Sequence, residues 1–203
     1  MTHPRPLDLL IADDHTIVRR GLRFLLDEHL PQASIREVES YSELLERLKE
    51  REPDLLILDL QLTDRNTFGA IGRLRSAHPS MRILVFTMTN ARIFADTIMR
   101  AGVNGFLNKQ CTDEDIIGTV KRILSETHDP AATPVEMPET PLHALSMREI
   151  NVMHELLTGR SAKEIASRLD IEVTTVATYK RRLFEKLGAT SILDLQRMVN
   201  EHA

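Results

Sequence analysis

Short apolar runs alternate with amphipathic segments through the first part of the chain. The runs LDLLIA, LLILDL and RILVFT are apolar at nearly every position, as in strands that are covered on both faces. The segments between them repeat apolar residues at helical spacing. Five strand–helix units predict an α/β fold, with a doubly wound five-stranded parallel sheet. The expected strands are 7–12, 34–40, 55–60, 82–87 and 105–109, and the expected helices are 16–29, 41–51, 67–77, 91–101 and 113–127.

The stretch from 126 to 144 interrupts this pattern. It holds Pro130, Pro134, Pro138 and Pro141 and has neither helical nor alternating apolar periodicity. Such a composition indicates an extended linker between two domains. The predicted organisation is a first domain over 1–127, a Pro-rich linker over 128–143 and a second domain over 144–203.

Only helical patterns follow the linker, which predicts a small all-α domain. A fourth helix is expected from Thr174, as its cap, to Leu187, with Gly188 ending it. A helix, a short turn and this helix have the layout of a helix-turn-helix. Three other helix starts show the serine-to-acid spacing of a capping box, namely Ser146 with Glu149, Ser161 with Glu164 and Ser191 with Asp194.

Composition narrows the class of protein. The chain has no apolar run long enough for a transmembrane helix, and its N-terminus lacks the apolar core of a signal peptide. Its one cysteine cannot form an internal disulfide, so a cytoplasmic protein without membrane contact is expected. The net charge is −4, yet residues 180–186 hold four basic side chains against one acidic one. This basic stripe in an acidic chain indicates a polyanion-binding surface.

Polar side chains stand at the ends of four expected strands. Asp13 and Asp14 follow the first strand, and Asp59 lies at the end of the third. Thr87 ends the fourth strand and Lys109 ends the fifth. Because the carboxyl ends of parallel strands meet at one edge of a sheet, these side chains are expected to converge.

Such a cluster favours a cation and phosphate chemistry. Three neighbouring carboxylates raise one another's pKa unless a cation lies among them, and carboxylate oxygens suit Mg²⁺. An aspartate can also attack phosphorus to give an aspartyl phosphate, with a lysine and a hydroxyl stabilising the phosphoryl oxygens. Taken singly, Asp13 or Asp14 is more typical of a helix N-cap.

These residues resemble the receiver domain of two-component response regulators. The resemblance covers 7–127 through ADDH, LDL, the strand-end threonine and AGVNGFLNK. It implies that Asp59 is the phosphoacceptor and Mg²⁺ the cofactor. By the same resemblance, the Mg²⁺ ligands would be Asp13, Asp14, Asp59 and the backbone carbonyl of Gln61, the switch pair would be Thr87 and Phe106, and Lys109 would contact the phosphate.

Several residues depart from the receiver pattern. Thr63 and Thr67 stand where the family usually has proline and glycine, and Met88 stands where a small residue usually follows the switch threonine. A bulky thioether there would crowd the acceptor. A second hypothesis is therefore a receiver-like module that responds to a partner without phosphate. A third is a metal-dependent phosphohydrolase, although no second acid or base is evident near Asp59.

The segment ALSMREINVMHELLTGRSAKEIASRLDIEVTTVATYKRRLFEKLGA resembles the LuxR-type helix-turn-helix, and the whole chain a NarL/FixJ-type response regulator. In such domains the N-terminal part of the second helix reads bases. The resemblance implies base contacts by Ala177, Thr178 and Arg181, and phosphate contacts by Lys163, Thr175, Lys180, Arg182 and Lys186. The final amphipathic segment TSILDLQRMVNEHA either packs within its own domain or dimerises.

The leading interpretation is a transcription regulator, not an enzyme, that Mg²⁺-dependent phosphorylation of Asp59 switches. Its expected partners are promoter DNA, a sensor histidine kinase or a small phosphodonor, and a second copy of the chain when active.

Overall fold

A computed structural model describes residues 6–88, 98–125 and 145–201. The predicted linker, 128–143, and most of the expected helix over 91–101 lie outside these residues. The chain divides into two compact units, one built around a sheet and one built from helices. Each unit is described by itself.

The first unit contains the predicted five-stranded parallel sheet. Its strands are β1 (Asp8–Ala12), β2 (Ser34–Val38), β3 (Leu55–Leu58), β6 (Arg82–Thr87) and β7 (Gly105–Asn108). Their order across the sheet is β2-β1-β3-β6-β7, with every pair parallel. All five residues of β1 are buried, as both faces of the sheet are covered. The doubly wound fold that the sequence predicts is confirmed.

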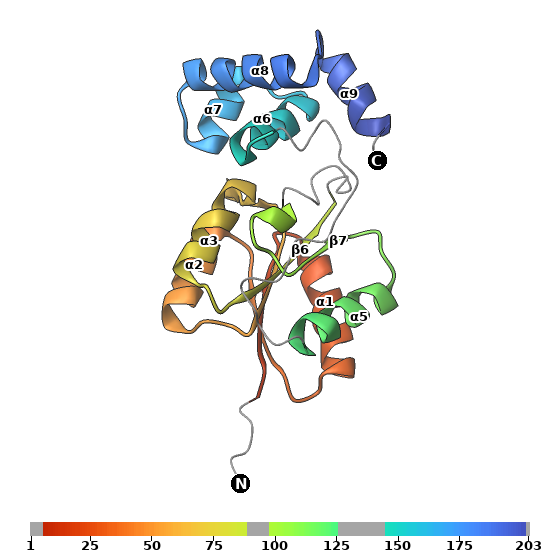
Figure 1. Ribbon diagram of the computed structural model, residues 1–203. Coiled ribbons are helices and arrows are strands. Elements are labelled where there is room, and N and C mark those ends of the chain that lie inside the picture. Colours follow the sequence, from red (N-terminus) through yellow and green to blue (C-terminus); the bar gives the residue numbers. More distant parts are fainter. Residues whose placement is uncertain (1–5, 89–97, 126–144, 202–203) are drawn as a thin grey trace. The chain divides into compact units, whose positions relative to one another are not determined.

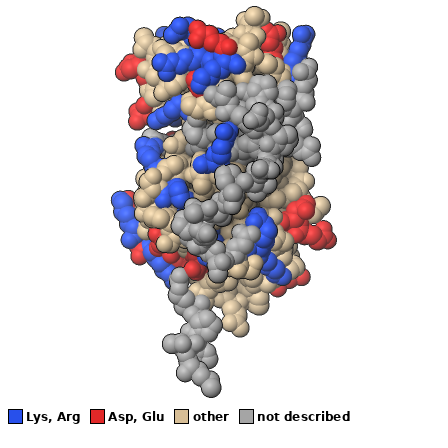
Figure 2. All heavy atoms as spheres, in the orientation of Figure 1, with Lys and Arg blue, Asp and Glu red and all other residues tan. Residues whose placement is uncertain are grey.

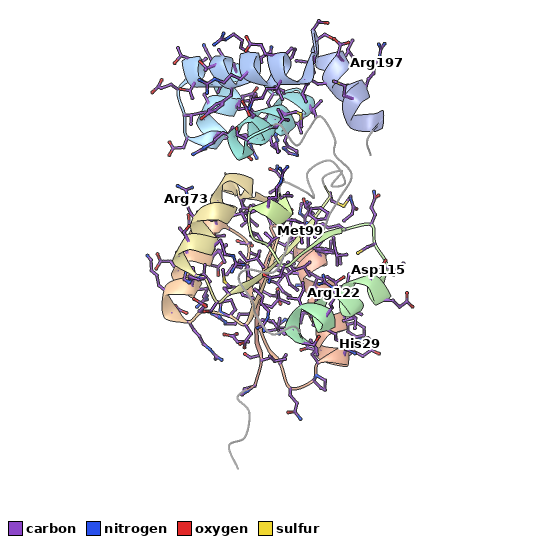
Figure 3. The ribbon with its side chains drawn as sticks, viewed as in Figure 1. His29, Arg73, Met99, Asp115, Arg122 and Arg197 are labelled. Atoms are coloured by element: carbon purple, nitrogen blue, oxygen red, sulfur yellow. The ribbon has the colours of Figure 1, made fainter. Side chains whose placement is uncertain are left out.

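Helices cover both faces of this sheet (Figure 1). The helices α1 (Thr16–His29) and α5 (Asp113–Ser125) lie on one face, and α2 (Tyr41–Glu50) and α3 (Ile71–Ala77) lie on the other. Acidic residues in the first turn of α5 and Arg122 in its last turn complement the helix dipole. Figure 3 shows Asp115 and Arg122 near opposite ends of this helix.

The segment after β3 differs from the expected helix over 67–77. Residues 61–66 form a hairpin of β4 (Gln61–Leu62) and β5 (Arg65–Asn66), and a 3-10 turn, η1 (Phe68–Ala70), precedes α3. The helix begins only at Ile71, and Thr67 is bonded back to the carbonyls of Asp59 and Leu60, just after β3. We call residues 59–67 the acceptor loop.

The second unit contains α6 (Met147–Leu157), α7 (Ala162–Leu169), α8 (Val173–Leu187) and α9 (Ile192–Glu201). Both predicted capping boxes at the starts of α6 and α7 are present, and Gly188 ends α8 in the left-handed region at φ 64°. The expected Thr174 cap is wrong. The amides of Thr175 and Val176 donate to the carbonyl of Glu172, which holds the cap position two residues earlier, and the helix begins at Val173.

A buried carboxylate ties α6 to α7 in this unit. Glu155 has a side chain that is 0% exposed, and its Oε2 lies 2.6 Å from Arg160 Nη1 and 3.3 Å from Arg168 Nε. Burial alone would raise the pKa of Glu155, but the hydrogen bond with His154 and the charges of both arginines lower it below its ordinary value. The charge stays buried because two cations compensate it.

Candidate functional site

The sheet brings three distant residues into direct contact. Asp13, Asp59 and Lys109 have side chains that are 2%, 3% and 4% exposed. The ammonium of Lys109 lies 2.6 Å from Asp13 Oδ2 and 2.7 Å from Asp59 Oδ2. Lys109 reaches this position because its amide donates to the carbonyl of Thr87, which extends the β6–β7 pairing by one residue. The predicted convergence of the strand ends is present.

Asp14 and His15 complete an acidic cluster with these residues. One ligand atom from each of Asp13, Asp14, His15 and Asp59 lies within 4.8 Å of the others. Neither aspartate is the N-cap of α1, because His15 holds that position and donates its amide to Asp13 Oδ1. The helix-cap interpretation of this acidic pair is therefore wrong.

Two carboxylate oxygens of this cluster lie close to a side-chain nitrogen but accept no hydrogen bond. Asp13 Oδ2 and Asp14 Oδ1 are buried, and each lies 2.6 Å from a nitrogen, of Lys109 and His15 respectively. The angles at these contacts do not meet hydrogen-bond geometry. These carboxylate lone pairs therefore fit a hard cation.

The remaining predicted site residues lie on the adjoining strands and loop. Thr87 is buried at the end of β6, and Phe106 is half-buried on the neighbouring β7. Gln61 donates its amide to Asp59 Oδ1 at 3.2 Å. Met88 is 59% exposed, so it is not buried against the acceptor.

The acceptor loop is anchored at its base, a feature that the sequence did not reveal. The hydroxyl of Thr67 donates to the backbone carbonyl of Asp59 at 2.6 Å, and Thr67 is 0% exposed. The amide of Thr67 donates to the carbonyl of Leu60. The only sign in the sequence was that Thr67 replaces the usual glycine. That replacement did not indicate which group the Thr67 hydroxyl would bond.

The tip of the same loop is anchored to α2. Asp64 accepts hydrogen bonds from the amides of Tyr41 and Ser42 and from the Ser42 hydroxyl, at 2.7, 2.9 and 2.6 Å. Burial alone would raise the pKa of Asp64, but these hydrogen bonds lower it. The hydroxyl of Thr63 donates to the carbonyl of Glu39 at 2.9 Å. An aspartate from the loop thus adds a second cap to a helix that Ser40 already caps.

Arg19 supports the acidic turn from α1. Its Nη1 donates to the carbonyl of Asp13 at 2.7 Å. Its other nitrogens lie 3.4 Å from Glu37 Oε2 and 3.5 Å from Glu39 Oε2, at the end of β2 and just beyond it. The arginine therefore links the turn that carries Asp13 to the segment against which the hairpin tip is held.

In the helical unit, α8 exposes most of the predicted DNA contacts. Ala177, Thr178 and Arg181 are exposed, and the Thr178 hydroxyl donates to the carbonyl of Thr174 at 3.0 Å. Of the predicted phosphate contacts, Lys163, Lys180 and Arg182 are also exposed, Thr175 is half-buried and Lys186 is paired as described below. Figure 2 shows that the visible face of this unit carries side chains of both signs.

Three of the basic side chains on α8 have partners within the unit. Lys186 Nζ donates to Glu149 Oε2 at 2.8 Å, and Glu149 is the buried third residue of the α6 capping box. Arg181 pairs with Glu185 at 3.4 Å, and Lys180 lies 5.5 Å from the centre of the Phe184 ring. The ion pair of Lys186 competes with its predicted phosphate contact, whereas the exposed pair of Arg181 is weak.

The last helix packs into its own unit and also leaves apolar surface outside. Leu195 is buried, whereas Leu193 is 67% exposed. An open groove of about 700 Å³ runs along α8 and the start of α9, with Arg181, Phe184 and Ile192 among its lining residues. The last helix thus packs within its own domain through Leu195. Its use in dimerisation, for which Leu193 is exposed, stays a prediction.

Family models match both units. The response regulator receiver domain matches residues 9–121, and the bacterial regulatory proteins of the luxR family match residues 143–199. No helix in the described parts of the chain is both long and apolar enough to cross a membrane.

Similar proteins match this chain over nearly their whole length. The Fimbriae Z protein of Salmonella typhimurium is 31% identical over 98% of both chains. The putative positive transcription regulator of virulence factors BvgA, from Bordetella pertussis, is 32% identical over 92% of this chain and 93% of its own. The structure of RcsB from Salmonella enterica serovar Typhimurium, bound to promoter rprA in the presence of the phosphomimetic BeF3−, has a TM-score of 0.74. It is 24% identical and covers 96% of this chain and 98% of its own, a likeness of fold. The chain therefore belongs to the two-component response regulators that join a receiver domain to a LuxR-type DNA-binding domain.

Proposed function

We propose that phosphorylation of Asp59 controls the binding of α8 to promoter DNA. The observation that carries the proposal is the buried contact of Asp59 with Lys109, at 2.7 Å, beside the carboxylates of Asp13 and Asp14. A carboxylate oxygen of Asp59 would attack phosphorus, forming an O–P bond as the bond to the leaving group of the donor breaks. The donor is a sensor histidine kinase or a small acyl phosphate.

Mg²⁺ is the proposed cofactor of this site. Asp13, Asp14, Asp59 and the backbone carbonyl of Gln61 would hold it, and the two carboxylate oxygens without hydrogen-bond geometry support this assignment. When bound, the ion neutralises charge that develops on the phosphoryl oxygens. Lys109 would donate to the same oxygens, and the hydroxyl of Thr87, on the adjacent strand, would donate a hydrogen bond to one of them.

The proposed switch lies at the end of β6 and on β7. Thr87 is buried and pairs in register with Asn108, and Phe106 is two residues before it. A phosphoryl group that draws the Thr87 hydroxyl toward Asp59 would change the space beside the half-buried Phe106. Such a two-state element can bias dimerisation or release of the DNA-binding domain. The proposed active form is a homodimer on promoter DNA, and a cytoplasmic location stays a prediction.

The proposed domain boundaries are 1–127 and 144–203, with the linker over 128–143. The alternative, a receiver that does not use phosphate, rests on Met88 and on the altered loop after Asp59. A labile, Asp59-dependent phosphoprotein formed with acetyl phosphate and Mg²⁺ would exclude it. The described residues offer no observation that favours a phosphohydrolase.

The test of this function is DNA affinity with and without beryllofluoride and Mg²⁺. We expect the phosphate mimic with Mg²⁺ to tighten binding of the full chain to a selected promoter fragment by about tenfold or more, which corresponds to about 1.4 kcal/mol. Mg²⁺ alone and beryllofluoride alone serve as controls. Unchanged affinity and unchanged molecular size in the presence of both would contradict the proposal.

The γ-methyl group of Thr178 on α8 is proposed to recognise thymine. The Thr178 hydroxyl donates its proton to its own helix, so it can only accept from a base, and its γ-methyl is the group that is proposed to contact thymine. We expect Thr178→Val to keep the affinity for the selected site and Thr178→Ser to lose roughly fourfold, since one buried methyl contributes about 0.8 kcal/mol. Fluorescence anisotropy on labelled duplexes measures both. If serine binds like threonine and valine does not, the hydroxyl is the reader instead.

A further inference from the structure

We propose that Thr67 is a positioning residue for the phosphoacceptor Asp59. The acceptor carboxylate depends on the backbone that carries it, and β3 ends at Leu58, one residue earlier. The amide of Asp59 still donates to the carbonyl of Ala12 at 2.8 Å, which continues the ladder. Its carbonyl instead accepts the hydroxyl of Thr67. The inference rests on the proposed phosphorylation of Asp59.

The loop closes a ring of bonds on Asp59. Its side chain accepts the amide of Gln61, which is the first residue of β4. Gln61 pairs with Asn66 across the hairpin, and Asn66 is followed by Thr67. The Thr67 hydroxyl then returns to the Asp59 carbonyl at 2.6 Å. Both the carboxylate and the main chain of the acceptor are therefore held by the same short loop.

Burial makes this hydroxyl difficult to replace. Thr67 is 0% exposed and its hydrogen bond to Asp59 is buried, so loss of the hydroxyl would leave a buried carbonyl without its partner. The Asp59 carbonyl could then find another hydrogen-bond donor only if the backbone at Asp59 rotated. Such a rotation would move the carboxylate of Asp59 relative to Lys109 and to the backbone of Gln61. These are the groups proposed to contact the phosphoryl group and the Mg²⁺. Small displacements of reacting groups are costly in rate.

The hairpin tip gives a matched comparison within the same loop. Thr63 also donates its hydroxyl to a backbone carbonyl, that of Glu39, at 2.9 Å. That bond is exposed, and the neighbouring Asp64 accepts three further hydrogen bonds from α2. Loss of the Thr63 hydroxyl therefore leaves the tip attached. If Thr67 served only to keep the loop folded, its removal would lower the thermal stability without slowing phosphorylation of the molecules that remain folded.

The experiment measures Mg²⁺-dependent phosphorylation of the full chain by acetyl phosphate, with Phos-tag gels as the readout. We expect Thr67→Val to slow phosphorylation about tenfold, by analogy with other misplaced reacting groups, and Thr67→Ser to restore it to within about twofold of the parent. Thr63→Val is expected to stay within about twofold. Calorimetric titration with Mg²⁺ gives a second readout, and Thr67→Val is expected to weaken that binding as well.

The outcomes separate this inference from the function on which it rests. If the parent chain accepts no phosphate, the proposed function fails before Thr67 is tested. If the parent is phosphorylated and Thr67→Val matches it, or if Thr63→Val is slowed equally, the positioning role is overturned. Thermal unfolding establishes that each variant is folded at the assay temperature. Should valine prevent folding, Thr67→Ala removes the hydroxyl with less bulk and carries the same expectation.

Discussion

Asp59→Asn is expected to abolish the acetyl phosphate-dependent phosphoprotein, with labelling at least about a hundredfold below that of the parent chain. An amide oxygen is a poor nucleophile and the amide carries no negative charge, so the attack on phosphorus is lost. The variant also removes the charge that faces Lys109 at 2.7 Å. The measurement is incorporation of phosphate that alkaline treatment releases, since an aspartyl phosphate is an acyl phosphate.

The control for this variant is Asp27→Asn. It makes the same chemical change on an exposed residue of α1, outside the acidic cluster. Its labelling is expected to match the parent. Persistent labile labelling of Asp59→Asn would show that another carboxylate accepts the phosphate. In the DNA-binding assay, Asp59→Asn is expected to lose the response to beryllofluoride while keeping the basal affinity.

Asp8→Asn is expected to destabilise the receiver domain by about 3 kcal/mol, with the transition temperature lowered by roughly 10–20 °C. Asp8 begins β1 and is 0% exposed. Its carboxylate accepts Arg36 Nη2 at 2.8 Å and lies 3.0 Å from Arg51 Nε. Asparagine keeps the shape but turns a neutral amide toward two guanidinium groups. Because both arginines are partly exposed, the cost falls at the lower end for a broken buried pair.

A surface pair provides the contrast for Asp8. Lys49 and Glu46 lie 2.7 Å apart on α2, but both side chains are about two thirds exposed or more. We expect Glu46→Gln to change stability by less than about 0.5 kcal/mol. Urea unfolding of the full chain, followed at amide signals of β1 and β2, measures both variants. Equal effects would show that burial does not decide the strength of these pairs.

The spacing of apolar residues correctly predicted those helices and strands whose pattern is contained within the element itself. The expected helix over 16–29 matches α1, and all five strands lie within the predicted ranges. The capping boxes at Ser146 and Ser161 formed as expected, because each needs only residues within one turn. The convergence of Asp13, Asp59 and Lys109 was also predictable, since strand ends share an edge in this sheet topology.

The acceptor loop shows where such reasoning stops. LTDRNT has no apolar period, and its shape depends on side-chain bonds to Glu39, Tyr41 and Ser42, which are distant in sequence. The role of Arg19 was not predictable for the same reason, because its acidic partners lie on β2 and just beyond it. Met88 was expected to crowd the acceptor on size alone, and its exposure of 59% is a property that size did not predict.

The pairing of Lys186 with Glu149 bears on how the chain would search DNA. A basic side chain on DNA displaces condensed counterions, and each phosphate contact steepens the dependence of affinity on salt by about 0.9 in logarithmic slope. Lys186 is already held at 2.8 Å by a carboxylate that is 3% exposed, and leaving it would strand that buried charge. Each subunit would thus release fewer ions from DNA than its count of basic residues on α8 suggests.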